Sequence, residues 1–248
     1  MPSSAPLSVP DEAVPAGDAT HYESVRLFLD RALAVAPGFE IVDGNRAAIS
    51  WWAALREDAR LKRLASSIVY IEQPIRRSHA LSGDISALAE DKPVIIDESD
   101  DSLEAFPRAR RLGYSGVSSK TCKGIYKSIL NAARCRMWNM EEGRDRYFMS
   151  GEDLTIQAGL ALQQDLALVS LLGLSHVERN GHHYVNGMAG LPEAEQDAFL
   201  RAHRDLYERS HGAVRPRISG GMLEIKSLDV PGFASRVHPD WRTMRGVA

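Results

Sequence analysis

The chain has 248 residues, which suits one large domain or a domain with a tail, because domains usually hold about 100–200 residues. Apolar residues make up 44% of the chain and charged residues 25%, a composition typical of globular proteins that excludes wholesale disorder. The 30 Lys and Arg residues against 33 Asp and Glu residues give a net charge of −3. This charge argues against nucleic acid or an anionic membrane as the main partner.

The two cysteines, Cys122 and Cys135, form no CxxC motif, so we expect a reduced protein without a cysteine metal site. The N-terminus has no basic segment followed by an apolar stretch, and therefore shows no secretory signal. The most apolar stretch, residues 166–174, is about half as long as a membrane span. We expect a cytoplasmic protein.

The first 20 residues contain four prolines among small and acidic residues, and we expect residues 1–20 to form a flexible arm. Residues 21–248 are then expected to form the folded domain. A first helix is predicted over residues 25–36, where apolar residues recur at helical spacing and Pro37 and Gly38 follow.

Beyond this helix, short apolar runs that end in a polar or charged residue alternate with longer stretches of helical pattern. The runs cover residues 39–43, 69–72, 94–97 and 116–120, with weaker ones at 147–153 and 174–178. The helical stretches cover residues 52–64, 102–112, 125–136 and 154–172. A repeat of about 25–30 residues is the length of one strand–helix unit, so the pattern predicts a parallel sheet.

Two α/β folds fit this pattern, a (β/α) barrel of the TIM type and a doubly wound sheet. In both folds the carboxyl ends of the strands meet on one side, and ligands bind there. No convincing Gly-rich phosphate loop follows a predicted strand, which favours the barrel. The repeat provides about six βα units where a closed barrel has eight, so we expect a partial barrel.

Carboxylates end three consecutive predicted strands, at Asp43, Glu72 and Asp97. Three carboxylates aimed at one point repel one another unless a cation lies between them. Oxygen ligands alone select a hard ion such as Mg²⁺, with Mn²⁺ as an alternative. The competing interpretation is that each is an ordinary strand-end acid or helix N-cap.

Two lysines follow at the next predicted strand end, Lys120 and Lys123. A lysine held near a divalent metal in a dry site has a lowered pKa and can act as a general base. Strand alternation places Ser118 and Gly116 on the same face as Lys120, where their small size leaves room for its side chain. The alternative for each lysine is a solvated side chain.

Four short motifs occur in this order along the chain: Asp43-Gly-Asn45, Tyr70-Ile-Glu72-Gln-Pro74, Ile96-Asp97-Glu98-Ser99 and Lys120-x-x-Lys123-Gly124. Together they resemble the barrel domain of the enolase superfamily, in particular the mandelate racemase/muconate lactonizing group. The tail from residues 221–224 to 231–233 resembles the closing segment of that family, and the resemblance covers residues 22–235.

This resemblance implies that Asp43, Glu72 and Asp97 bind Mg²⁺. It also implies that Lys120 moves a proton at the carbon next to the carboxylate of a small substrate, and Asp153 falls where many members carry a seventh-strand acid. The expected function is therefore a Mg²⁺-dependent isomerase or lyase: a racemase or epimerase, a cycloisomerase or a dehydratase.

The chain also departs from the family pattern. Family members carry a capping domain and two barrel strands before the Asp-Gly-Asn motif, and the lysine subgroup has a second base on the second strand. We expect these parts to be missing, which leaves a second hypothesis, a truncated non-catalytic homologue that acts as an interaction partner. An open barrel edge would also favour a homo-oligomer, or pairing with another chain that covers the edge.

Histidines gather near the last predicted strand. His176 and Glu178 share the same strand face, so they are candidates for an acid/base or carboxylate-binding group at the strand end. Zinc is a weaker interpretation because the spacing to His182 and His183 matches no standard ligand pattern, and a polar loop is the alternative. Glu152 and Asp153 are adjacent and point in different directions, which argues against a carboxylate pair.

Overall fold

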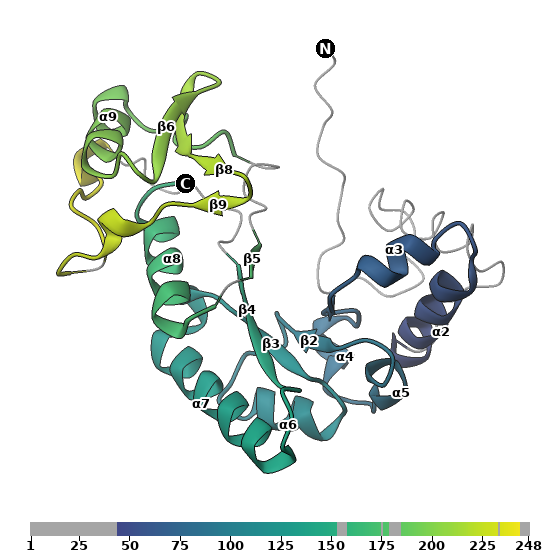
Figure 1. Ribbon diagram of the computed structural model, residues 1–248. Helices are drawn as coiled ribbons and strands as arrows, with labels where there is room; N and C mark the ends of the chain where they lie inside the picture. Colours follow the sequence, from purple (N-terminus) through teal and green to yellow (C-terminus); the bar gives the residue numbers. More distant parts are fainter. Residues whose placement is uncertain (1–43, 153–157, 175, 179–184, 233, 244–248) are drawn as a thin grey trace. The chain divides into compact units, whose positions relative to one another are not determined.

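The computed structural model describes residues 44–152, 158–174, 176–178, 185–232 and 234–243 (Figure 1). They belong to two compact units, Met1–Ser115 and Gly116–Ala248, which are described separately below. The expected arm over residues 1–20, the predicted helix at 25–36 and the apolar run at 39–43 lie outside the described residues.

The predicted alternation of strands and helices is confirmed, and the fold class is α/β. Strand pairs β1–β2, β3–β4 and β4–β5 are all parallel, and the strand order follows the order along the chain. The strands are β1 (Ile71–Glu72), β2 (Val94–Ile96), β3 (Gly116–Ser119), β4 (Phe148–Glu152) and β5 (Val177–Glu178). This sheet is consistent with part of a (β/α) barrel, while a barrel of six units stays a prediction.

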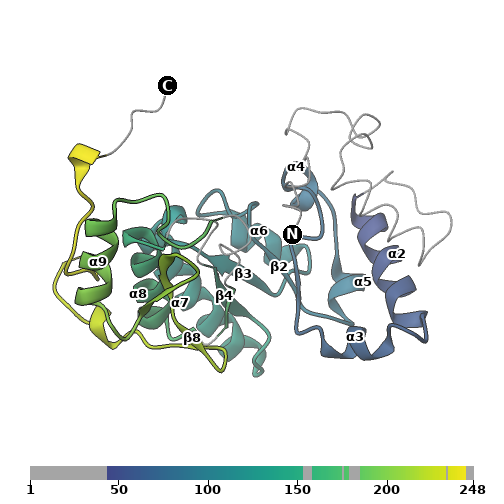
Figure 2. The ribbon, with the colours of Figure 1, turned by 90° about the horizontal axis from the view of Figure 1, so that it is seen from above.

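Helix α2 contacts α3, α4 and α5 in the first unit, and Figure 2 shows α2, α3 and α5 grouped together. The helices are α2 (Gly44–Glu57), α3 (Lys62–Ser67), α4 (Arg77–Ala80), α5 (Ser86–Ala89) and α6 (Ala105–Arg111). The helix predicted over 52–64 is divided between α2 and α3. At the break, the Asp58 side chain accepts a hydrogen bond from the backbone N–H of Arg60 at 2.8 Å. Such a side-chain bond to a nearby backbone group competes with helix formation.

The first unit has its core around β2. Val94, Ile95 and Ile96 are all fully buried, as in parallel strands that are covered on both faces. Tyr114 is also fully buried, and its hydroxyl donates to the carbonyl of Ala80 at 2.9 Å. The core thus joins the strand to the segments that flank it in the chain.

Two long helices accompany the strands of the second unit, α7 (Ile125–Glu142) and α8 (Leu160–Leu172), after the short 3₁₀ turn η2 (Thr121–Lys123). Helix α7 extends six residues beyond the predicted end at 136. It stops at Gly143, whose φ of 65° is the left-handed conformation that commonly ends helices.

The faces of β3 and β4 follow from their contacts with these helices. The Ser119 hydroxyl donates to that of Ser128 on α7 at 3.0 Å, and a Cβ on Gly151 would lie 2.7 Å from Val169 on α8. Because side chains alternate along a strand, Ser118 and Ser150 occupy the opposite face, and they are register partners.

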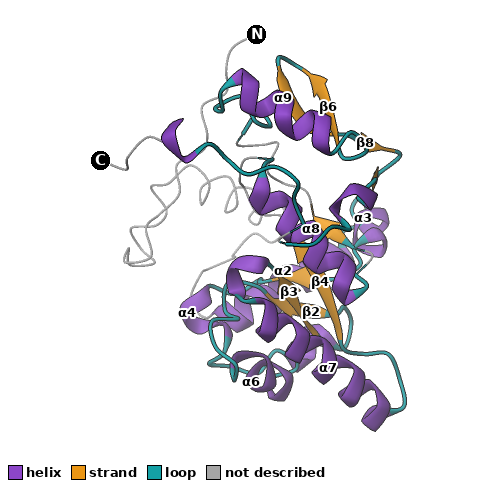
Figure 3. Cartoon of the chain, turned by 90° about the vertical axis from the view of Figure 1, so that its left-hand side faces the viewer, coloured by secondary structure: helices purple, strands orange, loops and turns teal. Residues whose placement is uncertain are grey.

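A second cluster of buried residues forms a hydrophobic core within the second unit. Tyr207, Phe199 and Leu162 are at its centre, and Figure 3 shows α9 beside the hairpin of β6 and β7. The elements of this region are α9 (Glu193–Ala202), β6 (Tyr207–Ser210), β7 (Ala213–Pro216), β8 (Ile218–Ser219), β9 (Met222–Leu223), η4 (Lys226–Leu228) and η5 (Trp241–Thr243). Among the described helices, none is both long and apolar enough to cross a membrane.

Candidate metal and proton-transfer site

Charged residues occupy the carboxyl ends of four strands. In the first unit, Glu72 is the last residue of β1 and Asp97 follows β2 directly. In the second unit, Glu152 is the last residue of β4 and Lys120 follows β3 directly. The carboxyl ends of parallel strands are where α/β proteins bind ligands, so these four side chains are the primary candidates for a functional site.

The Gln73 side chain fixes the backbone around Asp97. Its Oε1 accepts hydrogen bonds from the backbone N–H groups of Asp97 at 2.8 Å and of Ser99 at 3.2 Å. Its Nε2 donates to the Ser99 hydroxyl at 2.8 Å and to the carbonyl of Ile75 at 2.7 Å. The four hydrogen bonds of this amide therefore connect the end of β1 to the segment that follows β2.

This arrangement places Gln73 in an unusual backbone conformation. Its φ of 41° lies in the left-handed region, which costs a non-glycine residue on the order of 1 kcal/mol. A strained residue next to Glu72 persists only where the surroundings hold it, and the four hydrogen bonds of its side chain do so. The result is that Asp97, which is 4% exposed, has a defined backbone position.

Lys120 and Glu152 form a buried ion pair within the second unit. The Lys120 Nζ lies 2.5 Å from a carboxylate oxygen of Glu152, and the two side chains are only 7% and 10% exposed. Removing two charges from water is costly, so a buried pair is weak evidence for a role in stability. Its position at two adjacent strand ends makes a role in ligand chemistry the better explanation.

Asp165 on α8 holds the chain where it leaves β3. One of its carboxylate oxygens accepts from the backbone N–H of Thr121 at 2.7 Å and from the Thr121 hydroxyl at 2.5 Å. Burial raises the pKa of Asp165, and the charge of Glu152 acts in the same direction, while the bonds from Thr121 and the charge of Lys120 oppose them. Asp165 thereby fixes the residue that follows Lys120.

Lys123 has a different position from Lys120. It is half-buried, and its Nζ donates to the backbone carbonyl of Ser118 at 2.9 Å. The Ser118 and Ser150 hydroxyls are buried, and neither has a hydrogen-bond partner. Ser118 and Ser150 precede Lys120 and Glu152 by two residues and lie on the same face of the sheet, so this face is polar there as well.

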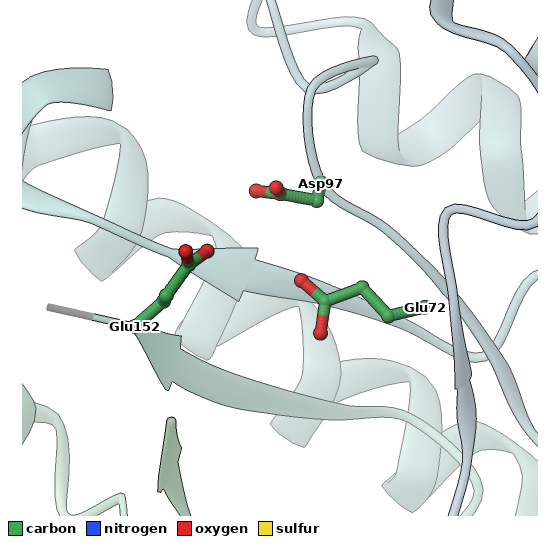
Figure 4. A group of neighbouring side chains, drawn as sticks. All are labelled: Glu72, Asp97 and Glu152. Carbon is green, nitrogen blue, oxygen red and sulfur yellow. The ribbon is translucent and has the colours of Figure 1, made fainter. Parts of the chain in front are cut away.

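Three carboxylates, Glu72, Asp97 and Glu152, could hold a metal ion (Figure 4). One oxygen of each lies within 4.8 Å of the others. Carboxylate oxygens suit hard cations such as Mg²⁺ and Mn²⁺ and disfavour soft ones.

Several residues singled out from the sequence are only partly described. Asp43, Asp153, His182 and His183 lie outside the described residues. His176 is exposed, and its backbone carbonyl accepts from the N–H of Gly151 at 2.9 Å. Glu178 is the register partner of Glu152 at the ends of β5 and β4, although its side chain is outside the description.

Sequence reasoning missed three residues of this site: Glu152, Gln73 and Asp165. Strand alternation places Lys120 on one face of the sheet but does not say whether Glu152 or Asp153 lies on that face. The register of β3 on β4 decides this, and the sequence does not contain it. The other two gave no signal, because a helical aspartate and a glutamine before proline are ordinary sequence features.

No protein-family model and no curated protein matches the sequence. Among solved structures, the chain is similar to a mandelate racemase/muconate lactonizing protein from Herpetosiphon aurantiacus, with 14% identity and a TM-score of 0.45. It is also similar to the L-Ala-D/L-Glu epimerase from Bacillus subtilis, solved in a substrate-liganded complex, with 11% identity and a TM-score of 0.45. The matches cover 70% and 71% of this chain but only 43% and 42% of those proteins. Both structures belong to the enolase superfamily, the family that the four motifs of the sequence resemble.

Proposed function

We propose that the chain is a divalent-metal-dependent isomerase or lyase that removes a proton from the carbon next to a substrate carboxylate. One observation carries the proposal: the described acids at the strand ends include a group able to hold a metal ion, and Lys120 pairs with a member of that group. The motifs that resemble the enolase superfamily support the same chemistry.

The donor set fits a hard cation. Glu72, Asp97 and Glu152 offer only oxygen atoms, and two of the three side chains are buried. Three carboxylates that lie close together repel one another, so a bound cation would relieve their repulsion. The sequence prediction adds Asp43 as a further ligand. Mg²⁺ is the proposed ion, with Mn²⁺ as an alternative.

Each residue of the proposed site would have its own role in the reaction. When bound, the cation would supply positive charge that stabilises the negative charge developing on the substrate carboxylate. Lys120, as a neutral amine, would accept the proton from the neighbouring carbon and become an ammonium beside the Glu152 carboxylate. Gln73 and Asp165 would keep Asp97 and Lys120 in place, and the burial of Asp97 and Lys120 would exclude water from competing proton transfers.

Metal binding tests the first half of the proposal. Calorimetric titration with Mg²⁺ should show stoichiometric binding by the folded protein, and Asp97→Asn should abolish it because the amide is neutral. The matched control is Asp91→Asn, which alters an exposed aspartate that pairs with Arg56. An intact, folded protein that binds neither Mg²⁺ nor Mn²⁺ would refute the metal assignment.

Proton exchange tests the second half. In D₂O with Mg²⁺, a panel of hydroxy acids and amino acids should include a substrate whose α-proton exchanges with solvent. Lys120→Ala should remove this exchange without removing metal binding. Lack of exchange across a broad panel, with metal bound, would favour the non-catalytic homologue instead.

A further inference from the structure

Helix α7 exposes an apolar face in the second unit. Six large apolar side chains of this helix are exposed: Ile125, Tyr126, Ile129, Leu130, Met137 and Met140. Tyr126 is 89% and Met140 82% exposed, so these two side chains contact almost nothing in the described structure. Scattered exposed apolar residues are ordinary, but a continuous apolar face on one helix marks an interaction surface.

The buried side of the same helix is more polar than its exposed side. The side of α7 that faces the protein carries Ser128, Asn131, Cys135 and Trp138. At 100° per residue, the exposed apolar residues and Ala133 fall within an arc of about 140° that is centred opposite these four and that also contains Arg136 near one edge. A soluble helix normally has the reverse pattern, with its apolar stripe toward the core. Packing within the chain therefore does not account for the apolar face of α7.

We propose that this face binds the same face of α7 in a second copy of the chain, with the two helices antiparallel. Residues 126, 130, 133, 137 and 140 are spaced alternately by four and three, as in helices that pack side by side with a left-handed twist. The large residues lie toward the two ends and Ala133 lies at the middle. A two-fold axis at Ala133 would let the backbones approach there.

The same axis pairs complementary side chains at the ends of the two helices. Residues whose numbers sum to about 266 lie at the same level along the two helices, so Tyr126 of one copy meets the partner's Met140. Contacts between a methionine sulfur and an aromatic ring are favourable, and each copy contributes one. A self-complementary patch of this kind is what a symmetric dimer requires.

Charge on one flank of the stripe favours the antiparallel direction. Lys127 lies near the start of this flank and Glu141 near its end, so an antiparallel partner places opposite charges together at both ends. Arg134, at the centre, donates to the side chain of Asn131 at 3.1 Å, which draws its guanidinium toward the buried side of the helix. The antiparallel axis also brings the two copies of Arg134 near each other, so the preference for this direction rests on Lys127 and Glu141.

Solution mass tests the proposal on the full chain. Sedimentation or light scattering at micromolar concentrations should give a dimer, and Leu130→Glu should shift it to a monomer because the new carboxylate would be buried between the helices. Leu171→Glu is the matched control, since it changes an exposed leucine on α8 and should leave the dimer intact. Circular dichroism of both variants checks that they remain folded. A wild-type monomer, or a dimer that Leu130→Glu leaves unchanged, would overturn the proposal.

A cross-link tests the position of the axis. In a Cys122→Ser background, which removes the exposed native thiol, Ala133→Cys should form a disulfide between two copies under mild oxidation. Leu171→Cys in the same background should stay uncoupled. Equal cross-linking of the two variants, or none at Ala133→Cys in a confirmed dimer, would contradict the antiparallel α7 pair.

Discussion

The Gln73 amide makes four hydrogen bonds to residues around the ends of β1 and β2. Gln73→Met keeps the size of the side chain but leaves the backbone N–H of Asp97 without this partner. We expect the free energy of unfolding to fall by about 1–3 kcal/mol, the cost of leaving buried polar groups unpaired. We also expect weaker Mg²⁺ binding, because the position of Asp97 is no longer fixed.

Ser99→Ala is the control for this prediction. It removes one acceptor of the Gln73 amide but keeps the bond from Asp97 N–H to Gln73 Oε1. Denaturant unfolding and calorimetry should therefore show a smaller loss of stability and unchanged Mg²⁺ affinity. Equal effects of the two substitutions on Mg²⁺ affinity would show that the bond to Asp97 has no special importance.

A second residue-scale prediction concerns pH and His203, which is fully buried in the second unit. Its Nε2 accepts from the backbone N–H of Arg236 at 3.1 Å, so Nδ1 carries the proton and donates to the Ser227 hydroxyl. Burial lowers the pKa of His203, helped by the charge of Arg236 and opposed by that of Asp205. The folded state therefore prefers the neutral ring.

The sign of the pH effect follows from this preference. The stability contributed by neutral His203 is complete above its unfolded pKa of 6.5 and is lost as pH falls through the folded value. Between these two pKa values the loss approaches about 1.4 kcal/mol per pH unit, and below the folded value it levels off because both states are then protonated. Unfolding curves at several pH values should show a shallower acid slope for His203→Gln than for the wild type. Equal acid slopes for the two proteins would contradict a neutral, buried His203.

Position at the end of a strand identifies some of the site residues from the sequence, but not all of them. Glu72, Asp97 and Lys120 were identified because a polar residue at the end of an apolar run is visible in the sequence. For Glu152 and Asp153, the sequence indicates only that two adjacent acids point in different directions, which argues against a carboxylate pair. Only the pairing of Ser118 with Ser150 decides that Glu152 shares the face of Lys120.

At the scale of elements, β4 and α8 pack so closely that Gly151 has no room for a side chain. Gly151→Ala would bring its Cβ within 2.7 Å of a Val169 methyl group, and we expect overpacking to cost about 1–3 kcal/mol. Val169→Ala removes that methyl group, so the double variant should lose less stability than the sum of the two single variants. Strict additivity in the denaturant unfolding of the three proteins would contradict this packing.

The sequence predicted the presence of helices and strands better than the residues at which they begin and end. The run 94–97 matches β2 closely because buried parallel strands are continuous apolar runs. The helix predicted at 52–64 failed to anticipate the break before α3, since the local bond from Arg60 to Asp58 competes with helical pairing. The hairpin of β6 and β7 was not predicted, and in the structure it packs against α9.

At the scale of the whole molecule, the proposed metal site predicts coupling between ligand and stability. A cation that binds only the folded protein stabilises it by about 2.7 kcal/mol at a free concentration of 100 times its Kd. Mg²⁺ should therefore raise the melting temperature in calorimetry, and a chelator should reverse the rise. Ca²⁺, a hard cation that prefers more ligands, is the comparison ion. No change in melting temperature with Mg²⁺ or Mn²⁺ would argue against a site formed in the folded state.

The sequence by itself determined the α/β class, the approximate place of five strands, and the identity of Glu72, Asp97 and Lys120 as strand-end residues. These features follow from local periodicity and from the rule that strand ends collect functional groups. Only the tertiary structure decided that Glu152 pairs with Lys120, that Gln73 holds Asp97, and that α7 turns its apolar side outward. Those features depend on strand register and helix orientation, which are set by contacts between segments distant in the chain.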